Sequence, residues 1–390
     1  MNIYTLYLES IAQGGEALGR INGKPVFVEG GAPDETVCCR TVEEHKTWAR
    51  AELLEIITPS PERIDSSCAF YGKCGGCNLQ HINYDAQIAL KAAILKDALC
   101  RIGGLSPVEI EIVPSQPWEY RNRMQFHCLR QNVQNSRNYG FKGRRSDEII
   151  PVSDCPVAVS GIREFIKNKK WIPLPPEKDR FTVYSKNSTF LSDGGELIPG
   201  VVERAKITLL ENELFLDAGV FFQSNIAMLE KLILELKKTA ENAQRNLPMA
   251  DLYCGAGTFA IFLGGLFPKV ILAEENKKAI NIARENLKGA DAEFFALRDT
   301  DWPDALMRRR DFGFAVADPP RGGMASKLAS AFAHNGPPLL AYVSCDAPSL
   351  ARDAKILING GYKLKKLTFF DFYPQTAHIE SLAVFEKQGI

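Results

Sequence analysis

Three residues with reactive side chains lie at the ends of short apolar runs. Cys345 and Asp318 each follow such a run, and Glu380 precedes one. Apolar runs of this length predict buried strands, and in open α/β sheets ligands bind beyond the strand ends. A single cysteine in this position would ordinarily be a packed core residue. The two acidic residues instead predict a cleft where a thiol and carboxylates meet, with a helix beginning just after Ser349.

A second group of cysteines has the spacing of metal ligands. Cys68, Cys74 and Cys77 form a CxxxxxCxxC pattern, with glycines that let the backbone fold around a bound ion or cluster. In a reducing compartment, neighbouring thiolates repel one another unless a cation neutralises them. Zinc accepts such a set, and so does an iron–sulfur cluster, which needs a fourth cysteine. Cys155, which precedes a proline, is the best candidate for that ligand.

The segment 249–286 has the pattern of a nucleotide-binding βαβ unit. One apolar run leads through Asp251 into a glycine turn with Gly255 and Gly257, and a second apolar run ends at Glu274. An acidic residue after the second strand is the position that binds ribose hydroxyls. NAD fits this pattern loosely, but the turn lacks the stricter glycine motif that binds a pyrophosphate. S-adenosylmethionine needs no phosphate cradle and fits an acidic turn better.

Three units are expected to position these residues. Residues 1–59 alternate apolar and polar side chains between glycine turns, which predicts a five-stranded OB-like barrel, a shape that often grips single-stranded nucleic acid. Residues 60–215 contain the cysteines, an amphipathic helix at 84–102 and irregular strands, and they form a central α+β domain. We expect that helix to pack on the next unit. Residues 216–390 alternate strands and helices, as α/β sheets do.

Composition and charge place few limits on the partner. The 390 residues are 45% hydrophobic and 24% charged, as in ordinary globular proteins, and the formal net charge of +0 means that RNA binding would need a local basic face. Basic residues cluster at 121–123, 142–145, 167–170 and 308–310. The first cluster also has aromatic and amide neighbours suited to base stacking. The sequence has no run of about 18 apolar residues, so we expect a cytoplasmic protein without a membrane partner.

Taken in order, these motifs resemble those of the RNA uracil-5 methyltransferases that carry an iron–sulfur cluster. The resemblance covers nearly the whole chain. It rests on the barrel, the four cysteines, Phe222–Gln223, Asp251–Gly255, Asp318–Arg321, Ser344–Cys345, Leu350–Asp353 and His378–Glu380. It implies a Rossmann-like class I S-adenosylmethionine-dependent methyltransferase domain, an N-terminal TRAM barrel and a central iron–sulfur domain.

The resemblance also implies a role for each motif residue. Cys345 would be the nucleophile and Glu380 the base. The implied ligands of a [4Fe-4S] cluster are Cys68, Cys74, Cys77 and Cys155. The implied contacts to S-adenosylmethionine are Gln223, Tyr253, Glu274, Asp299 and Asp318.

The reaction implied is methylation of carbon 5 of a uridine in 23S rRNA by a monomer that binds RNA and not DNA. Transfer-RNA members of the family typically lack both the barrel and the cysteine set, whereas ribosomal members keep the cluster. A thiolate must first add to carbon 6 of uracil so that carbon 5 becomes nucleophilic, and a base then removes the proton from carbon 5. The target base must leave its stack to be reached.

One residue departs from the family pattern. Asp346 stands where the family usually has Asn, and its charge would raise the pKa of Cys345. Three alternatives stay open: a tRNA uracil-5 methyltransferase, a cluster-containing RNA-binding protein without turnover, and an NAD-dependent oxidoreductase with a ferredoxin-like cluster. The last would leave Cys345 and Glu380 without a role. Titration with S-adenosylhomocysteine and with NAD would separate it from the others.

Overall fold

The structure is a computed structural model that describes residues 3–105, 108–130, 137–168, 179–194, 201–307 and 311–389. The basic residues predicted to cluster at 169–170 and 308–310 lie outside these ranges. In the described part of the chain, no helix combines the length and the apolar character needed to cross a membrane.

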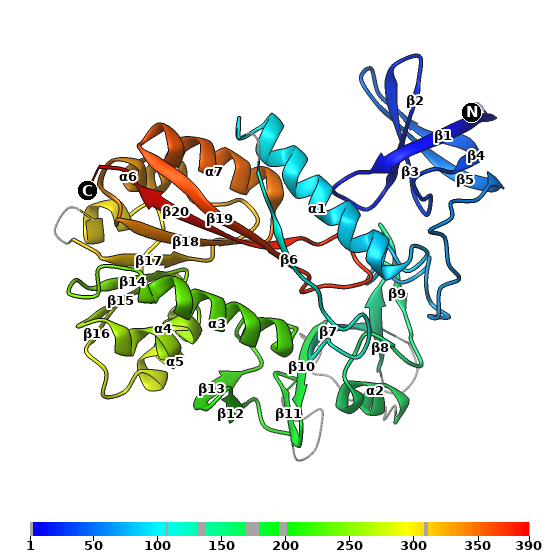
Figure 1. Cartoon of the computed structure of the whole chain (residues 1–390). Coiled ribbons are helices and arrows are strands. Elements are labelled where there is room, and N and C mark those ends of the chain that lie inside the picture. Colours follow the sequence, from blue (N-terminus) through cyan, green and yellow to red (C-terminus); the bar gives the residue numbers. More distant parts are fainter. Residues whose placement is uncertain are drawn as a thin grey trace.

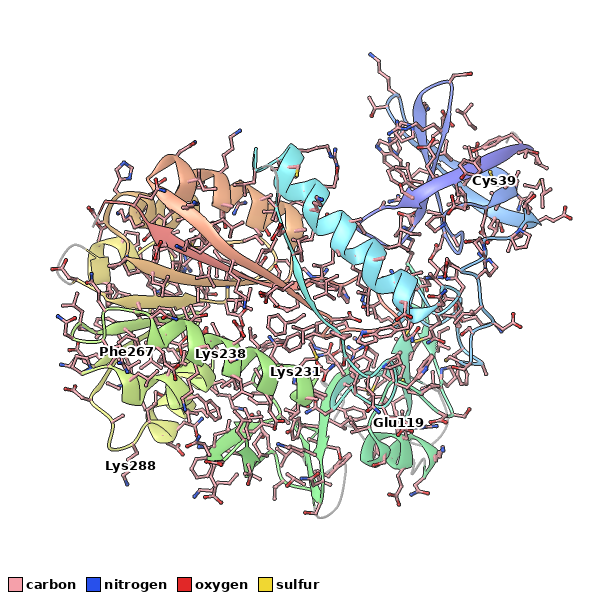
Figure 2. The ribbon with its side chains drawn as sticks, in the orientation of Figure 1. Cys39, Glu119, Lys231, Lys238, Phe267 and Lys288 are labelled. Carbon is pink, nitrogen blue, oxygen red and sulfur yellow. The ribbon has the colours of Figure 1, made fainter. Side chains whose placement is uncertain are left out.

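The N-terminal unit is a closed barrel with strand order β1-β2-β3-β5-β4, as the sequence predicted (Figure 1). Its strands are β1 (Ile3–Ile11), β2 (Ala17–Ile21), β3 (Lys24–Val28), β4 (Thr36–Glu44) and β5 (Ala49–Thr58). Alternate side chains point inward, and Cys39 is one of those that are fully buried (Figure 2). Leu79, Ile82 and Ala377, which come from outside the barrel, complete its apolar core.

The largest unit is an eight-stranded sheet with the order β16-β15-β14-β17-β18-β20-β19-β6. Its strands are β6 (Glu111–Val113), β14 (Met249–Leu252), β15 (Val270–Ala273), β16 (Ala292–Phe295), β17 (Phe314–Ala317), β18 (Leu339–Ser344), β19 (Tyr362–Phe370) and β20 (Glu380–Lys387). Strands β14 to β18 are parallel, whereas β20 runs antiparallel to its neighbours β18 and β19. The carboxyl ends of the parallel strands and the amino end of β20 therefore share one edge.

Helices cover both faces of this sheet (Figure 1). One face packs against α3 (Ile226–Glu241), α4 (Thr258–Leu263) and α5 (Lys277–Asn286). The other face packs against α1 (Tyr84–Arg101), α6 (Ser326–Asn335) and α7 (Ala347–Asn359). The arrangement is a Rossmann-like α/β sheet, the fold class that the sequence predicted. Short turns of 3-10 and π helix lie at Gly264–Leu266 and Pro303–Met307.

Two local features differ from the sequence prediction. Helix α7 begins at Ala347 rather than after Ser349, because the Asp346 side chain accepts a hydrogen bond from the Ser349 N–H (3.0 Å) and Pro348 suits a first turn. The three residues of β6 join the large sheet beside β19, although they lie far from it in the sequence. A strand of three residues has too little pattern to be recognised.

The central region contains a five-stranded sheet with the order β11-β10-β7-β8-β9 and a two-stranded sheet. Its elements are β7 (Arg123–Arg130), β8 (Arg137–Lys142), β9 (Ile149–Ile150), α2 (Ser160–Lys167), β10 (Arg180–Lys186), β11 (Thr189–Ser192), β12 (Arg204–Leu209) and β13 (Asn212–Asp217). Phe126, Tyr139 and Phe181 form an aromatic core between the larger sheet and α2. The cysteine segment 68–77 lies between β5 and α1.

Candidate active site

A cleft at the shared edge of the large sheet is lined by all seven residues predicted for catalysis and cofactor binding. They are Gln223, Tyr253, Glu274, Asp299, Asp318, Cys345 and Glu380. The volume of the cleft is about 680 Å³. Ser344 pairs with Ser381 across β18 and β20, so the next residues, Cys345 and Glu380, emerge side by side.

The half of the cleft beside β14 is shaped by the glycine turn. Tyr253 and Gly255 have left-handed φ values of 58° and 53°, which turn the chain sharply away from the strand. Glu274 accepts hydrogen bonds from the N–H groups of Gly255 (3.1 Å) and Asn276 (2.8 Å). The Tyr253 hydroxyl donates to Asp299 (2.9 Å). Glu274 and Asp299 are thus fixed in place and retain acceptor capacity for ribose hydroxyls.

Asp251 lies beneath the turn and is fully buried. Its carboxylate accepts a hydrogen bond from the N–H of Ala260 (3.0 Å), which joins β14 to α4. Burial raises the pKa of Asp251 to about 8. Asp251 does not line the cleft, so its role is to hold the turn rather than to touch the cofactor.

Cys345 is surrounded by acidic groups. Burial, followed by the charges of Glu380 and Asp318, raises the pKa of the Cys345 thiol to about 12, while Arg321 acts in the opposite direction. Asp346 raises this pKa as expected from the sequence, but its contribution is smaller. The free protein therefore holds Cys345 as a thiol, and a cation in the cleft would favour the thiolate.

The two buried carboxyl groups also oppose one another's ionisation. Burial raises the pKa of both Asp318 and Glu380, and the charge of Asp318 raises that of Glu380 further. Within the described residues, Glu380 Oε1 has no hydrogen-bond partner. A buried carboxyl oxygen without a partner, next to a thiol, is placed to accept a proton from a bound substrate.

Several residues that sequence reasoning did not assign complete the cleft wall. The Tyr373 hydroxyl donates to Gln223 Oε1 (3.3 Å), and Arg321 donates to His378 Nδ1 (3.0 Å). Burial, with the charge of Arg321, lowers the pKa of His378 to about 4, so the imidazole is neutral and can accept that bond. Tyr373 ends an aromatic run that reads as strand core, so no local signal marks it as a cleft residue.

Two arginines have side-chain nitrogens without partners at the cleft. Arg121 and Arg123 line the cleft, and the Nε atom of each is buried with no partner among the described residues. Both belong to the 120–126 stretch in which the sequence predicted base stacking and phosphate contacts. Guanidinium groups in general are suited to contact a phosphate or a base edge.

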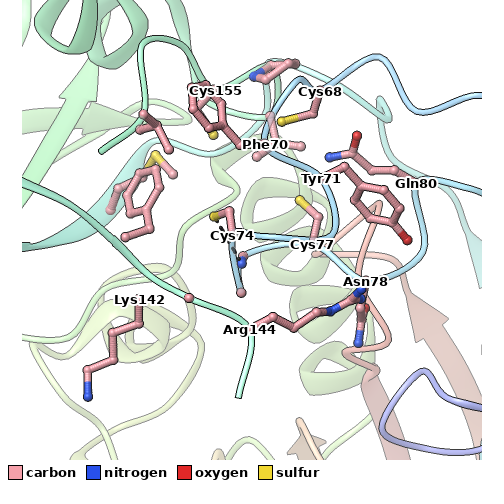
Figure 3. A pocket seen from close by; sticks show the side chains of 18 of the residues that line it. Cys68, Phe70, Tyr71, Cys74, Cys77, Asn78, Gln80, Lys142, Arg144 and Cys155 are labelled. Carbon is pink, nitrogen blue, oxygen red and sulfur yellow. Dashed lines mark hydrogen bonds between the residues drawn. The ribbon is translucent and has the colours of Figure 1, made fainter. Parts of the chain in front are cut away.

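The four predicted cluster ligands surround a second pocket, of about 440 Å³ (Figure 3). They are Cys68, Cys74, Cys77 and Cys155. Arg144 and Arg121 line the same pocket, and Arg121 thus belongs to both sites. Burial raises the thiol pKa of Cys77 to about 11 and that of Cys155 to about 12, with neighbouring cysteine charges adding to the effect.

The four cysteines are not gathered tightly around one point. Among the described residues, no set of three or more His, Cys, Asp or Glu side chains is close enough to hold a single metal ion. Zinc would bring its sulfur ligands to about 3.8 Å from one another, as Zn–S bonds of about 2.3 Å require. Cys100 and Cys128 do not line the pocket.

Comparison with known sequences gives consistent matches. The sequence profile of the family described as tRNA (Uracil-5-)-methyltransferase matches residues 206–388. A protein of Aquifex aeolicus named "Uncharacterized RNA methyltransferase" is 31% identical, with 98% of each chain covered. The "23S rRNA (uracil(1939)-C(5))-methyltransferase RlmD" of Pseudomonas entomophila is 30% identical over 98% of this chain and 93% of its own.

A solved structure matches the whole architecture. It is the Pyrococcus abyssi tRNA (uracil-54, C5)-methyltransferase in complex with S-adenosyl-L-homocysteine, with a TM-score of 0.73 and 22% identity. The match covers 98% of this chain and 100% of that one. At this identity the likeness concerns the fold. It also means that the architecture, barrel included, does not by itself distinguish a ribosomal-RNA enzyme from a transfer-RNA enzyme.

Proposed function

The chain belongs to the tRNA (uracil-5-)-methyltransferase family, and we propose that it transfers a methyl group from S-adenosylmethionine to carbon 5 of one uridine in 23S rRNA. The observation that carries the proposal is the meeting of Cys345, Asp318 and Glu380 in a cleft lined by the predicted cofactor residues. The relatives named for uracil 1939 of 23S rRNA support that substrate.

Cys345 begins the reaction. The thiol first loses its proton to water. The thiolate sulfur then forms a bond to carbon 6 of the uracil, and the electron pair of the carbon 5–carbon 6 double bond moves toward the carbonyl at carbon 4, which makes carbon 5 nucleophilic. S-adenosylmethionine supplies the electrophilic methyl group and a positive sulfonium. Because acidic neighbours and burial raise the pKa of Cys345, that positive charge helps the thiolate to form when the site is filled.

Glu380 completes the reaction. Once carbon 5 carries the methyl group, Glu380 removes the remaining proton from that carbon, the double bond returns, and the bond between carbon 6 and the Cys345 sulfur breaks. Because burial and Asp318 raise the pKa of Glu380, this carboxyl group must lose its own proton before it can act as the base, and a positive charge in the filled site favours that ionisation. Tyr253, Glu274 and Asp299, with Gln223 and Asp318, are the proposed contacts to the cofactor.

The proposed holoprotein also contains a [4Fe-4S] cluster. The proposed ligands are Cys68, Cys74, Cys77 and Cys155. The proposal is supported by four soft thiol donors around one pocket, and by Arg121 and Arg144, whose charges would offset an anionic cluster. Such a cluster would cross-link the segment 68–77, which follows the barrel, to Cys155 between β9 and α2.

A covalent trap tests the proposed reaction. RNA that carries 5-fluorouridine should form a stable adduct with Cys345, because fluorine cannot leave carbon 5 as a proton does. Cys345→Ala should abolish the slowly migrating protein–RNA species on a denaturing gel, and Cys100→Ala in α1 should retain it. An adduct that persists in Cys345→Ala would assign the nucleophile to another residue.

The substrate needs its own comparison. Purified protein should methylate protein-free 23S rRNA and leave unmodified tRNA unchanged, as measured by transfer of the labelled methyl group. The reverse result would make the protein a tRNA methyltransferase with the same chemistry. Binding of NAD in place of S-adenosylhomocysteine in a calorimetric titration would contradict both.

A further inference from the structure

The loop 371–379, between β19 and β20, carries Tyr373 and His378 into the cleft and ends at Glu380. It has neither helix nor strand, yet Asp371, Gln375 and Thr376 are buried. Gln375 has a φ of 68°, a left-handed conformation that L-residues rarely adopt. A strained, buried backbone of this kind persists only where contacts from outside hold it.

Helix α1 supplies the first of these contacts. Lys91 Nζ donates to Asp371 Oδ1 (2.7 Å) and to the carbonyl of Tyr373 (2.9 Å). Gln87 Nε2 donates to Gln375 Oε1 (3.0 Å), and the Gln375 N–H donates to Gln87 Oε1 (2.9 Å). Since Lys91, Gln87 and Asp371 are fully buried, these bonds do not compete with water. They fix the first half of the loop.

The cysteine segment holds the second half. The N–H groups of Asn78 and Leu79 both donate to the carbonyl of Gln375 (3.1 and 3.0 Å). The Asn78 side chain then accepts a hydrogen bond from the N–H of Ala377 through Oδ1 (2.9 Å). Asn78 directly follows Cys77, so the catalytic loop is bonded to the residue next to a proposed cluster ligand.

The same Asn78 side chain also contacts the barrel. Its Nδ2 donates to the carbonyl of Gly14 (2.8 Å), in the turn between β1 and β2. The neighbouring Gly15 has a φ of 83°, and a Cβ atom there would lie 2.4 Å from Asn78 Nδ2, so the fit is close. From the same turn, Gln13 Nε2 donates to Asp346 Oδ1 (2.6 Å), beside the nucleophile.

The charge of the barrel favours this structural role over attraction of phosphates. Residues 1–59 contain nine acidic and five basic side chains, a net charge of −4 with histidine neutral. Three of the acidic side chains, Glu16, Glu29 and Glu35, are paired with Arg145, Arg144 and Arg63 from outside the barrel. The remaining excess of negative charge is small and gives no attraction for phosphates. The turn between β1 and β2 contacts Asp346 beside Cys345 and, through Asn78, the loop that ends at Glu380.

We propose that Asn78 is a positioning residue for methyl transfer. Its acceptor oxygen holds the loop 371–379, which sets the place of Glu380, and its donor nitrogen holds the barrel turn that contacts Asp346 beside Cys345. One amide therefore aligns the proposed base with the proposed nucleophile, and it does so from the cysteine segment. The inference rests on the proposed function, because alignment of these two residues matters only if both react with the uracil.

Two substitutions separate the functions of the amide. Asn78→Ala removes both bonds and should lower kcat about 10-fold to 100-fold, since displacements of about 1 Å cost that much in rate. The KM for S-adenosylmethionine should not change, because Asn78 does not line the cofactor cleft. Asn78→Asp keeps the acceptor for Ala377 and loses the donor to Gly14. It should restore part of kcat, because the loop 371–379 is held again while the barrel turn is still released.

The matched control is Asn242→Ala, which removes a similar amide bond, to the carbonyl of Lys238 (2.9 Å), at the far end of α3. Gly15→Ala offers an independent route, because its methyl group would displace the Asn78 side chain. It should reproduce the loss of kcat seen in Asn78→Ala. Iron content and the thermal midpoint are measured for every variant so that unfolding or loss of a cluster is recognised.

Hydrogen exchange decides the proposal without reference to turnover. Peptides that cover 371–380 should exchange their amide hydrogens faster in Asn78→Ala and Gly15→Ala than in the wild type. In Asn242→Ala the exchange rate should equal that of the wild type. Wild-type kcat together with wild-type exchange in Asn78→Ala would overturn the proposal. A wild-type protein that forms no 5-fluorouridine adduct would instead refute the proposed function, and the exchange comparison would still decide whether Asn78 holds the loop.

Discussion

The active-site cleft and the cysteine pocket share Arg121, yet they are built in opposite ways. In the cleft, Asp318, Cys345 and Glu380 each follow or begin a strand, so the pairing of one sheet fixes them. In the pocket, Cys68, Cys74 and Cys77 lie on a segment with no regular helix or strand. Sheet geometry positions the first group in the free protein, whereas the second group depends on bonds between loops and on what binds there.

The two sites also differ in the charge that surrounds their thiols. The cleft gathers carboxyl groups around a thiol and raises its pKa, so it is suited to receive a cation. The pocket gathers thiols beside two arginines, so it is suited to an anionic cluster. We therefore expect changes in the cleft to alter the chemistry, and changes in the pocket to loosen the loops that carry the cysteines.

The largest effect is expected for Glu380→Gln. Replacing the base should lower turnover by about 100-fold to 10,000-fold, the usual contribution of a general base. Because proton removal comes last, methylated RNA should accumulate in covalent linkage to Cys345, which mass spectrometry of the adduct detects. Unlinked methylated product at the wild-type rate would remove Glu380 from the mechanism. The iron content should equal that of the wild type, since Glu380 does not line the pocket.

Cys155→Ser tests the pocket in the same way. Anaerobically purified wild-type protein should be brown and contain about four irons per chain, as a cubane requires, and the variant should lose both. Cys100→Ser and Cys128→Ser are the controls and should keep the colour. One zinc per chain, with no iron after anaerobic reconstitution, would contradict the cluster.

Hydrogen exchange in iron-depleted protein compares the loop beside the pocket with the strands that form the cleft. Because Asn78 follows Cys77 and bonds to Ala377, loss of the cluster should speed hydrogen exchange in 371–380. Exchange in β17 and β18 should stay slow, since sheet pairing holds these strands. Equal exchange in 371–380 with and without iron would mean that the loop is fixed independently of the cluster.

A smaller effect is expected for Arg123→Ala. This arginine lines the cleft but not the pocket, so its loss should weaken RNA binding and leave the iron content unchanged. If Arg123 contacts a phosphate, the slope of log affinity against log salt should fall by about one. Arg40→Ala on the barrel is the control, and its slope should match that of the wild type. An unchanged slope in Arg123→Ala would exclude a phosphate contact.

The smallest effect is expected for Asp346→Asn. The amide oxygen can still accept the bond from the Ser349 N–H, which Oδ2 accepts in the wild type, whereas an amide nitrogen in place of Oδ1 cannot accept the bond from Gln13. The negative charge that raises the pKa of Cys345 is also lost. A lower pKa gives more thiolate at a given pH, so the pH profile of adduct formation should move to lower pH by roughly half a unit. A profile that moves to higher pH would mean that Asp346 helps to form the thiolate.

The parts of the site that the sequence predicted are those with a local pattern. Short apolar runs that end in Asp318 or Cys345 identify strand ends, and the spacing of Cys68, Cys74 and Cys77 identifies a ligand set. The barrel was likewise predicted from its alternating residues. A strand end shows where a side chain emerges, and parallel strands bring their carboxyl ends to the same edge of the sheet.

The parts that could not be predicted depend on residues far apart in the sequence. Nothing near Asn78 indicates a bond to Ala377, and nothing near Gln13 indicates a bond to Asp346. Such contacts leave no periodicity because each is made by a single side chain. The place of Tyr373 in the cleft could not be predicted for a related reason, since an aromatic residue after a strand is equally suited to the core.

The place of β20 between β18 and β19 has a consequence for synthesis. Translation delivers the barrel, the cysteine segment and β18 before residues 380–387 leave the ribosome, and until then the edge of β18 is unpaired. Cys345 and Glu380 meet only when β20 inserts, so the nascent chain holds a thiol with no base beside it. Premature termination before residue 380 should therefore yield an inert polypeptide with an open strand edge, a target for chaperones and proteases rather than a partly active methyltransferase.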